Sequence, residues 1–232
     1  MWSFVNPLLL LSIYTFVFTK VMPGARSAGL EPSQFSLFMF CGILPWTWFS
    51  SSLLEAANAL IAGGNLIRKV LFPAEVLPIV SVFAGLVHFC LGLPILAAFF
   101  LYLRAPVTPS DLVWLPLVVF DQLMLTLGLA LIVSSLTVHF RDLRDLLANL
   151  LTLGFFITPI IYPLAQAPAW AQPLLNLNPV THLVVSYQEV LFVPGPYAGW
   201  PRLVVLAAVS VLVFFVGYFV FDRLRETLAE EA

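Results

Sequence analysis

The side chains that could do chemistry are few and widely spaced in this sequence. Arg141-Asp142-Leu143-Arg144-Asp145 is a compact group of mixed charges at the predicted start of a helix, in which Arg141 and Asp145 are opposite charges at the i,i+4 separation. It can pin a helix end at lipid headgroups, or it can act as a gate or contact a motor subunit. Glu55, Asp121 and Glu189 are isolated acids.

The sequence argues against an enzyme. Gly63-Gly64-Asn65-Leu66-Ile67-Arg68-Lys69 is glycine-rich but lacks the G-x-x-x-x-G-K-[ST] spacing that cradles phosphates. His88, His139 and His182 have no cysteine or carboxylate nearby at ligand spacing, so we predict no metal site. The sequence also contains no G-x-S-x-G nucleophile motif. We predict a chain that does not bind ATP by itself.

The elements that position these groups are strongly apolar. Hydrophobic residues make up 61% of the chain and charged residues 9%, against roughly 25% charged in soluble domains. A membrane-crossing helix needs about 20 apolar residues. Six windows of at least 19 residues contain no Lys, Arg, Asp or Glu: 1–19, 32–54, 76–103, 122–140, 146–188 and 203–221. We therefore predict an all-α integral membrane protein, a single domain over residues 1–232 with six transmembrane helices.

The predicted spans are Phe4–Val21, Phe35–Leu60, Ala74–Leu103, Leu112–Val138, Leu146–Tyr162 and Arg202–Phe221. The fifth uncharged window is 43 residues long, too long for one crossing, and prolines recur in it at 159, 163, 168, 173 and 179. We expect a span followed by short re-entrant helices in the last extracytoplasmic connection, Pro163–Pro201. Within it, Thr181–Leu191 is predicted as one short amphipathic helix after Asn178-Pro179. The low charge of this connection predicts that it either dips toward lipid or packs against the bundle.

Charge near the span ends predicts the orientation. An even number of crossings leaves both termini on one side, which would hold six basic residues against four on the other. The six are Arg68, Lys69, Arg141, Arg144, Arg223 and Arg225; the four are Lys20, Arg26, Arg104 and Arg202. The positive-inside rule then places both termini in the cytoplasm. The net charge of −2 comes with no basic patch, so we predict no nucleic-acid partner.

The connection from Ala62 to Pro73 is a candidate docking surface. Asn65 can cap a short helix after the two glycines, and Pro73 would end that helix before the next span. The alternative is an interfacial turn with ordinary basic anchors.

Inside the predicted spans, Asp121 is the deepest acid. It can pair with a neighbour or line a wet path. Phe155, Phe156 and Tyr162 lie beside the proline break, where aromatic rings contact lipid or pack, or stack on sugar rings.

Motifs in the same order and spacing resemble ABC-2 type permeases that export polysaccharides and lipid-linked glycans, such as O-antigen, capsule and teichoic acid. The motifs are Asn6-Pro7-Leu8-Leu9, the stretch Asn65–Pro78, and His139-Phe140-Arg141-Asp142 followed by Phe155–Pro163 and Leu177–Thr181. The resemblance implies a permease in the cell (inner) membrane, among membrane lipids. It implies a homodimer with two copies of an ATP-binding cassette subunit that uses ATP and Mg, and a lipid-linked glycan as cargo.

The resemblance also implies roles for individual residues. Coupling to the ATPase would fall to Asn65, Leu66, Ile67, Arg68, Lys69, Val70 and Phe72. The cytoplasmic gate would be Arg141, Asp142, Arg144 and Asp145. The translocation path would include Phe155, Phe156, Thr158, Pro159 and Tyr162. The outer re-entrant helices would include Asn178, Pro179 and Glu189.

One feature departs from the family pattern. Members usually begin with a basic amphipathic helix ahead of the first span, whereas Met1 lies five residues before Asn6. We expect no residues of this sequence to perform that helix's roles. Two rival functions stay open: an ABC-2 exporter of a lipid or drug, and a motor-free, proton-coupled carrier that depends on Asp121 or His88.

Overall fold

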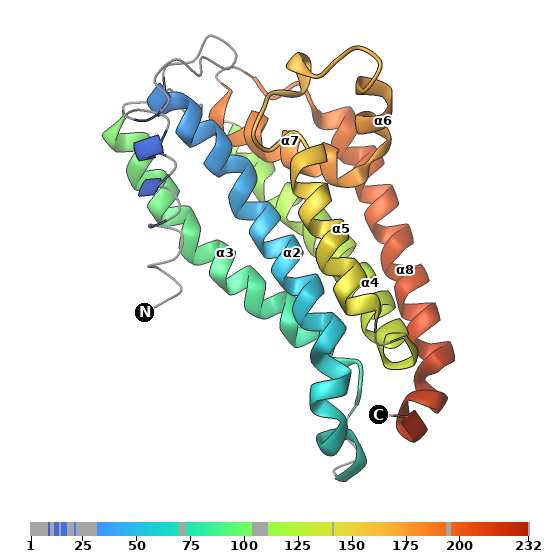
Figure 1. Ribbon diagram of the computed structural model, residues 1–232. Helices are drawn as coiled ribbons and strands as arrows, with labels where there is room; N and C mark the ends of the chain where they lie inside the picture. The colour runs from blue at the N-terminus through green and yellow to red at the C-terminus, as the bar shows by residue number, and fades with distance from the viewer. Residues whose placement is uncertain are drawn as a thin grey trace. The chain divides into compact units, whose positions relative to one another are not determined.

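The computed structural model describes residues 9, 12, 13, 15–17, 21, 32–69, 73–103, 111–140, 142–193 and 196–231. Within these ranges every regular element is a helix (Figure 1). The elements are α2 (Pro32–Lys69), α3 (Val76–Tyr102), η2 (Asp111–Trp114), α4 (Leu115–His139), α5 (Leu143–Ile157), η3 (Leu164–Gln166), α6 (Gln172–Leu177), α7 (Pro179–Phe192) and α8 (Trp200–Glu231).

Among the described residues, four helical segments are long and apolar enough to cross a membrane: Gln34–Gly63, Val76–Tyr102, Leu112–His139 and Trp200–Leu224. They correspond to the second, third, fourth and sixth predicted spans. The first predicted span, Phe4–Val21, lies mostly outside the described residues. The count of six transmembrane helices therefore stays a prediction.

The fifth predicted span has different bounds in the structure. Helix α5 has 15 residues and ends at Ile157 instead of Tyr162. At 1.5 Å per residue it is about 22 Å long, shorter than the roughly 30 Å of a bilayer core. It ends there because Pro159 disfavours a helical conformation at Thr158 and offers no N–H of its own.

The chain divides into two compact units. The first comprises 1–47, 88–119 and 155–204, and the second comprises 48–87, 120–154 and 205–232. In the first unit α7 packs beside α6 and η2. Its aromatic contacts include Phe89 against Tyr187 at 5.6 Å and Phe38 against Phe192 at 5.7 Å between ring centroids.

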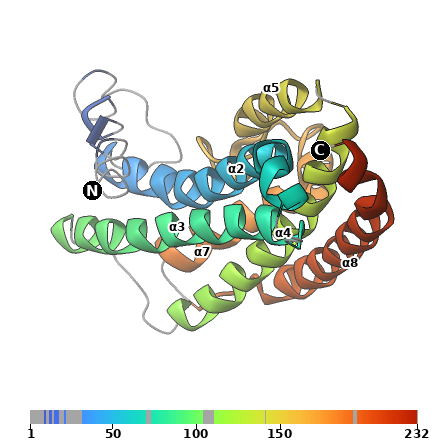
Figure 2. The ribbon, with the colours of Figure 1, turned by 90° about the horizontal axis from the view of Figure 1, so that it is seen from below.

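The second unit has a core formed by Leu60, Ala74, Leu131 and Phe221. Trp48 donates from Nε1 to the carbonyl oxygen of Val82 at 3.0 Å, which ties α2 to α3. The two helices run side by side in both views (Figures 1 and 2).

Helices α4 and α8 approach each other closely at two glycines in this unit. A Cβ on Gly128 would lie 2.5 Å from the carbonyl oxygen of Val213, and a Cβ on Gly217 would collide with the backbone of Gly128. Small residues at such crossings let helix backbones pack tightly where lipid gives little hydrophobic driving force between helices.

We therefore expect Gly217→Ala to cost about 1–3 kcal/mol, the usual penalty for overpacking, because backbone atoms on α4 cannot move aside as a flexible side chain would. The measurement is the heat-denaturation midpoint of the purified protein in mild detergent. Ala208→Val adds volume on the exposed side of the same helix and serves as the control. Equal midpoints for the two variants would contradict the prediction.

Candidate functional site

Helix α7 begins with a well-formed N-terminus. The side-chain Oδ1 of Asn178 accepts a hydrogen bond from the backbone N–H of Val180 at 3.0 Å, and Pro179 occupies the first helical position. Asparagine is among the best N-caps, and proline loses nothing at a position whose N–H has no helical partner. This confirms a helix after Asn178-Pro179, with bounds Pro179–Phe192. That the helix is re-entrant stays a prediction.

Helix α7 is buried within its unit. Nine of its 14 residues are buried. Buried Gln188 donates from Nε2 to the carbonyl oxygen of Pro159 at 3.0 Å, so α7 is bonded to the break that follows α5. Gly42 of α2 leaves room for this amide, because a Cβ there would lie 3.0 Å from Gln188 Nε2. The sequence left two alternatives, contact with lipid or packing on protein. In the structure, α7 packs on protein.

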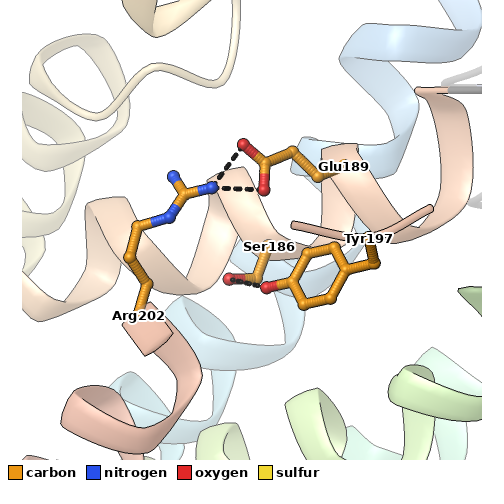
Figure 3. A network of polar contacts seen from close by, with 4 residues as sticks. All are labelled: Ser186, Glu189, Tyr197 and Arg202. Atoms are coloured by element: carbon orange, nitrogen blue, oxygen red, sulfur yellow. Dashed lines mark hydrogen bonds and ion pairs between the residues drawn. The ribbon is translucent and has the colours of Figure 1, made fainter. Parts of the chain in front are cut away.

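Four residues form a polar network that we call the α7–α8 network: Ser186, Glu189, Tyr197 and Arg202 (Figure 3). Nη2 of Arg202 lies 2.5 Å from Oε1 of Glu189 and also contacts Oε2. The side chains of Arg202 and Glu189 are 35% and 29% exposed, so the ion pair is partly shielded from solvent. Tyr197 donates from its hydroxyl to Ser186 Oγ at 3.3 Å.

The predicted path residues divide by burial. Thr158 and Pro159 are buried, Phe155 and Tyr162 are half-buried, and Phe156 is exposed. Tyr162 donates from its hydroxyl to the carbonyl oxygen of Ile157 at 2.6 Å, which satisfies a carbonyl at the end of α5. The rings of Phe155 and Phe156 meet edge to face at 5.3 Å. The structure thus brings these residues together around the end of α5.

Most of the predicted charged gate lies at the start of α5. Asp142, Arg144 and Asp145 are exposed, and Arg141 lies outside the described residues. Arg144 lines an open pocket of about 350 Å³ together with Glu55. Leu54, Asn58, Ala59, Ala62 and Ser81 complete the lining. Sequence reasoning treated Glu55 and the charged group separately, whereas the fold places Glu55 and Arg144 at one pocket.

The predicted coupling residues lie at the end of α2. Asn65, Leu66, Ile67, Arg68 and Lys69 continue that helix, while Val70 and Phe72 lie outside the described residues. The prediction that Asn65 caps a separate helix was wrong, because α2 runs through Gly63 and Gly64. A glycine costs a helix only about 1 kcal/mol, and Leu77 packs against Gly63 where a larger side chain would collide.

Sequence reasoning missed Arg202 and Gln188 as functional candidates. Gln188 was passed over because its partner is a backbone carbonyl, which has no signature in a sequence. Arg202 was counted only as a basic residue for orientation. Together these groups can hold α7 in place and offer hydrogen bonds to a polar ligand. Among the described residues no three His, Cys, Asp or Glu side chains gather where they could hold a metal ion.

Comparison with known proteins identifies relatives of this chain. A sequence model described as ABC-2 type transporter matches residues 1–192. An O-antigen export system permease protein, RfbA, from Myxococcus xanthus is 39% identical over 99% of this chain and 86% of its own length.

Other relatives cover the chain to a similar extent. An O-antigen export system permease protein RfbA of Klebsiella pneumoniae is 31% identical over 99% of this chain and 86% of its own length. A polysialic acid transport protein, KpsM, of Escherichia coli is 24% identical over 98% of this chain and 86% of its own length.

Proposed function

This chain belongs to the ABC-2 type transporter family, and we propose that it is the permease of an exporter of O-antigen or a related polysaccharide. The observation that carries the proposal is the match, over 99% of the chain, to O-antigen export permeases at 39% and 31% identity. The four helices in the described part of the chain that are long and apolar enough to cross a membrane fit a channel-forming subunit.

The assembly we propose follows the ABC architecture. Two copies of the chain form the permease in the inner membrane, both termini face the cytoplasm, and two ATP-binding subunits attach from that side. ATP and Mg act in the partner subunit. The absence of a phosphate-binding motif in the sequence supports this division of labour.

In the proposed mechanism, closure of the ATP-binding subunits presses on residues 65–72 of each protomer and separates the dimer seam. The charged group 141–145 gates the cytoplasmic entrance, and residues 155–162 line the path. The helices α6 and α7 close its outer end. The burial of α7 supports this assignment, because a helix held inside protein can bear on a passage, whereas a helix lying on lipid cannot.

One observation bears on the rival function, a proton-coupled carrier. Asp121 is buried in α4 at 1% exposure, and neither of its carboxylate oxygens has a hydrogen-bond partner among the residues that the structure describes. Buried acids within membrane spans often belong to proton pathways.

We expect Asp121→Asn to leave transport within about twofold of the unmodified protein, because an amide of equal size removes proton exchange without creating a cavity. The measurement is glycan transport in membrane vesicles supplied with ATP, with and without a proton gradient. A loss of tenfold or more, together with a requirement for the gradient, would favour the carrier.

The proposed function is tested by complementation. The chain and its ATP-binding subunit are expressed in cells whose own O-antigen permease gene is deleted but which still synthesise the lipid-linked glycan. We expect glycan to return to the cell surface and a stoichiometric ATP-binding subunit to copurify with the chain in mild detergent. Glycan that stays inside despite a copurifying complex would point to a lipid or drug as cargo.

A further inference from the structure

A pocket beside the α7–α8 network has the chemistry of a carbohydrate site. It has a volume of about 460 Å³ and is lined by residues of α2, the segment after α5, α6, α7 and α8. Its polar lining is Gln172, Asn176, Gln188, Glu189 and Arg202. This volume falls within the roughly 300–1,000 Å³ of small-molecule sites.

The charges in this pocket cancel. Glu189 and Arg202 are bonded to each other, so neither an anion nor a cation finds an uncompensated partner there. The remaining polar side chains are the uncharged amides of Gln172, Asn176 and Gln188. A pocket of this kind favours a neutral ligand that is rich in hydroxyl groups.

Hydrogen-bonding capacity remains for such a ligand. A guanidinium has five N–H donors. Within the described part of the chain, Arg202 uses one of its nitrogens, Nη2, to bond to protein. Gln172 and Gln188 use Nε2 to bond to the carbonyl oxygens of Ala167 and Pro159, at 3.0 Å in each case. These bonds hold the two amides in fixed positions, which lowers the entropic cost of using them to bind a ligand.

The apolar part of the lining suits the carbon face of a sugar ring. Phe38, Val185 and Val193 contribute to it, beside the amides. A sugar ring presents C–H groups on its faces and hydroxyls at its edge, so it matches a pocket with both kinds of surface. Gln188 is 3% exposed, which makes this a built pocket with a fixed polar group rather than a shallow surface patch.

We propose that this pocket holds one sugar unit of the glycan as the polymer leaves the transporter. The inference rests on the proposed function and on the outward orientation of α7. Weak contacts suit such a subsite, because each unit must be released as the next arrives. Single occupancy would help to keep the polymer from sliding back.

The test uses two alanines of the same connection. Ala165 lines the pocket, whereas Ala169 does not, and both are exposed. Each is replaced by Cys in a Cys90→Ser background, because Cys90 is exposed. The complete complex is labelled in spheroplasts with a membrane-impermeant maleimide. Cells that synthesise the glycan are compared with cells whose glycan synthesis is blocked.

We expect Ala165→Cys to react at least fivefold more slowly in cells that make the glycan, and Ala169→Cys to react equally in both. Equal rates for Ala165→Cys in the two strains overturn the inference. Fast labelling in both means an empty pocket, and slow labelling in both means another occupant such as lipid.

Replacing the same two alanines by a large side chain provides a second measurement. Ala165→Phe should slow glycan export severalfold, while Ala169→Phe should not. Surface glycan is also measured in cells that lack the chain. This control distinguishes failure of the pocket inference from failure of the proposed function. If glycan reaches the surface without the chain, the proposed function itself fails. If export needs the chain but Ala165→Phe exports normally, only the pocket inference fails.

Discussion

Replacing Arg68 and Lys69 together by Glu should abolish export while the protein still inserts and folds. If the end of α2 docks on the ATP-binding subunit, this change reverses two charges at the contact. Juxtaposed like charges at an interface cost several kcal/mol, and about 3 kcal/mol corresponds to roughly a hundredfold loss of affinity. The measurements are copurification of the ATP-binding subunit and the amount of glycan at the surface.

A matched control separates docking from membrane orientation, because basic residues on the cytoplasmic side also set topology. Arg223 is placed by prediction on the same side, and its guanidinium lies 5.2 Å from the ring centroid of Phe219. Arg223→Glu should keep export within about twofold, since a cation–π contact of this kind contributes about 0.5–1 kcal/mol. If both changes reduce export equally, the docking role of residues 65–72 is wrong.

Breaking the ion pair between Glu189 and Arg202 should be the most destabilising polar change in the α7–α8 network. Removing one partner of a buried pair costs about 3–5 kcal/mol. Because these side chains are 29% and 35% exposed, we expect about 2–3 kcal/mol for Glu189→Gln or Arg202→Gln. The double variant should cost less than the sum of the single variants, since the second change removes the charge left unpaired by the first.

The heat-denaturation midpoint of each purified variant in mild detergent measures this effect. Tyr197→Phe provides an internal scale, because it keeps the ring and removes the hydroxyl that donates to Ser186 at 3.3 Å. A neutral hydrogen bond contributes about 1 kcal/mol. Two results would contradict the prediction. Glu189→Gln would have the same denaturation midpoint as Tyr197→Phe, and the destabilisation of the double variant would equal the sum of the two single variants.

The long helices were predictable because composition alone determines them. Runs without charge as long as 76–103 and 203–221 fit few structures besides a membrane-spanning helix. Helix ends were harder to predict. Pro159 stopped α5 at Ile157, whereas Pro45 and Pro94 lie inside α2 and α3 without ending them. Neighbouring groups in a packed bundle can compensate for a missing N–H, so the sequence around a proline does not decide its effect.

The ion pair between Glu189 and Arg202 could have been predicted from the sequence. Glu189 and Arg202 are the only Asp, Glu, Lys or Arg residues between Asp145 and Asp222. Two opposite charges isolated in so apolar a stretch are expected to pair, because an unpaired charge in apolar surroundings is costly. The bond from Gln188 to the carbonyl oxygen of Pro159 was beyond such reasoning, because it depends on how α7 folds back onto the break after α5. The pocket formed by Glu55 and Arg144 likewise depends on packing between segments far apart in the chain.

The burial of α7 also has a consequence for biogenesis. Its side chains fit against residues of α2 and α3, such as Gly42 against Gln188 and Phe89 against Tyr187. The ribosome makes α2 and α3 first, and Arg202 leaves it only after α7. This region therefore cannot mature until the final helix begins to emerge, so it should be the last to resist protease after synthesis. A nascent chain halted before Arg202 should expose α7 to digestion even when its earlier helices are already inserted.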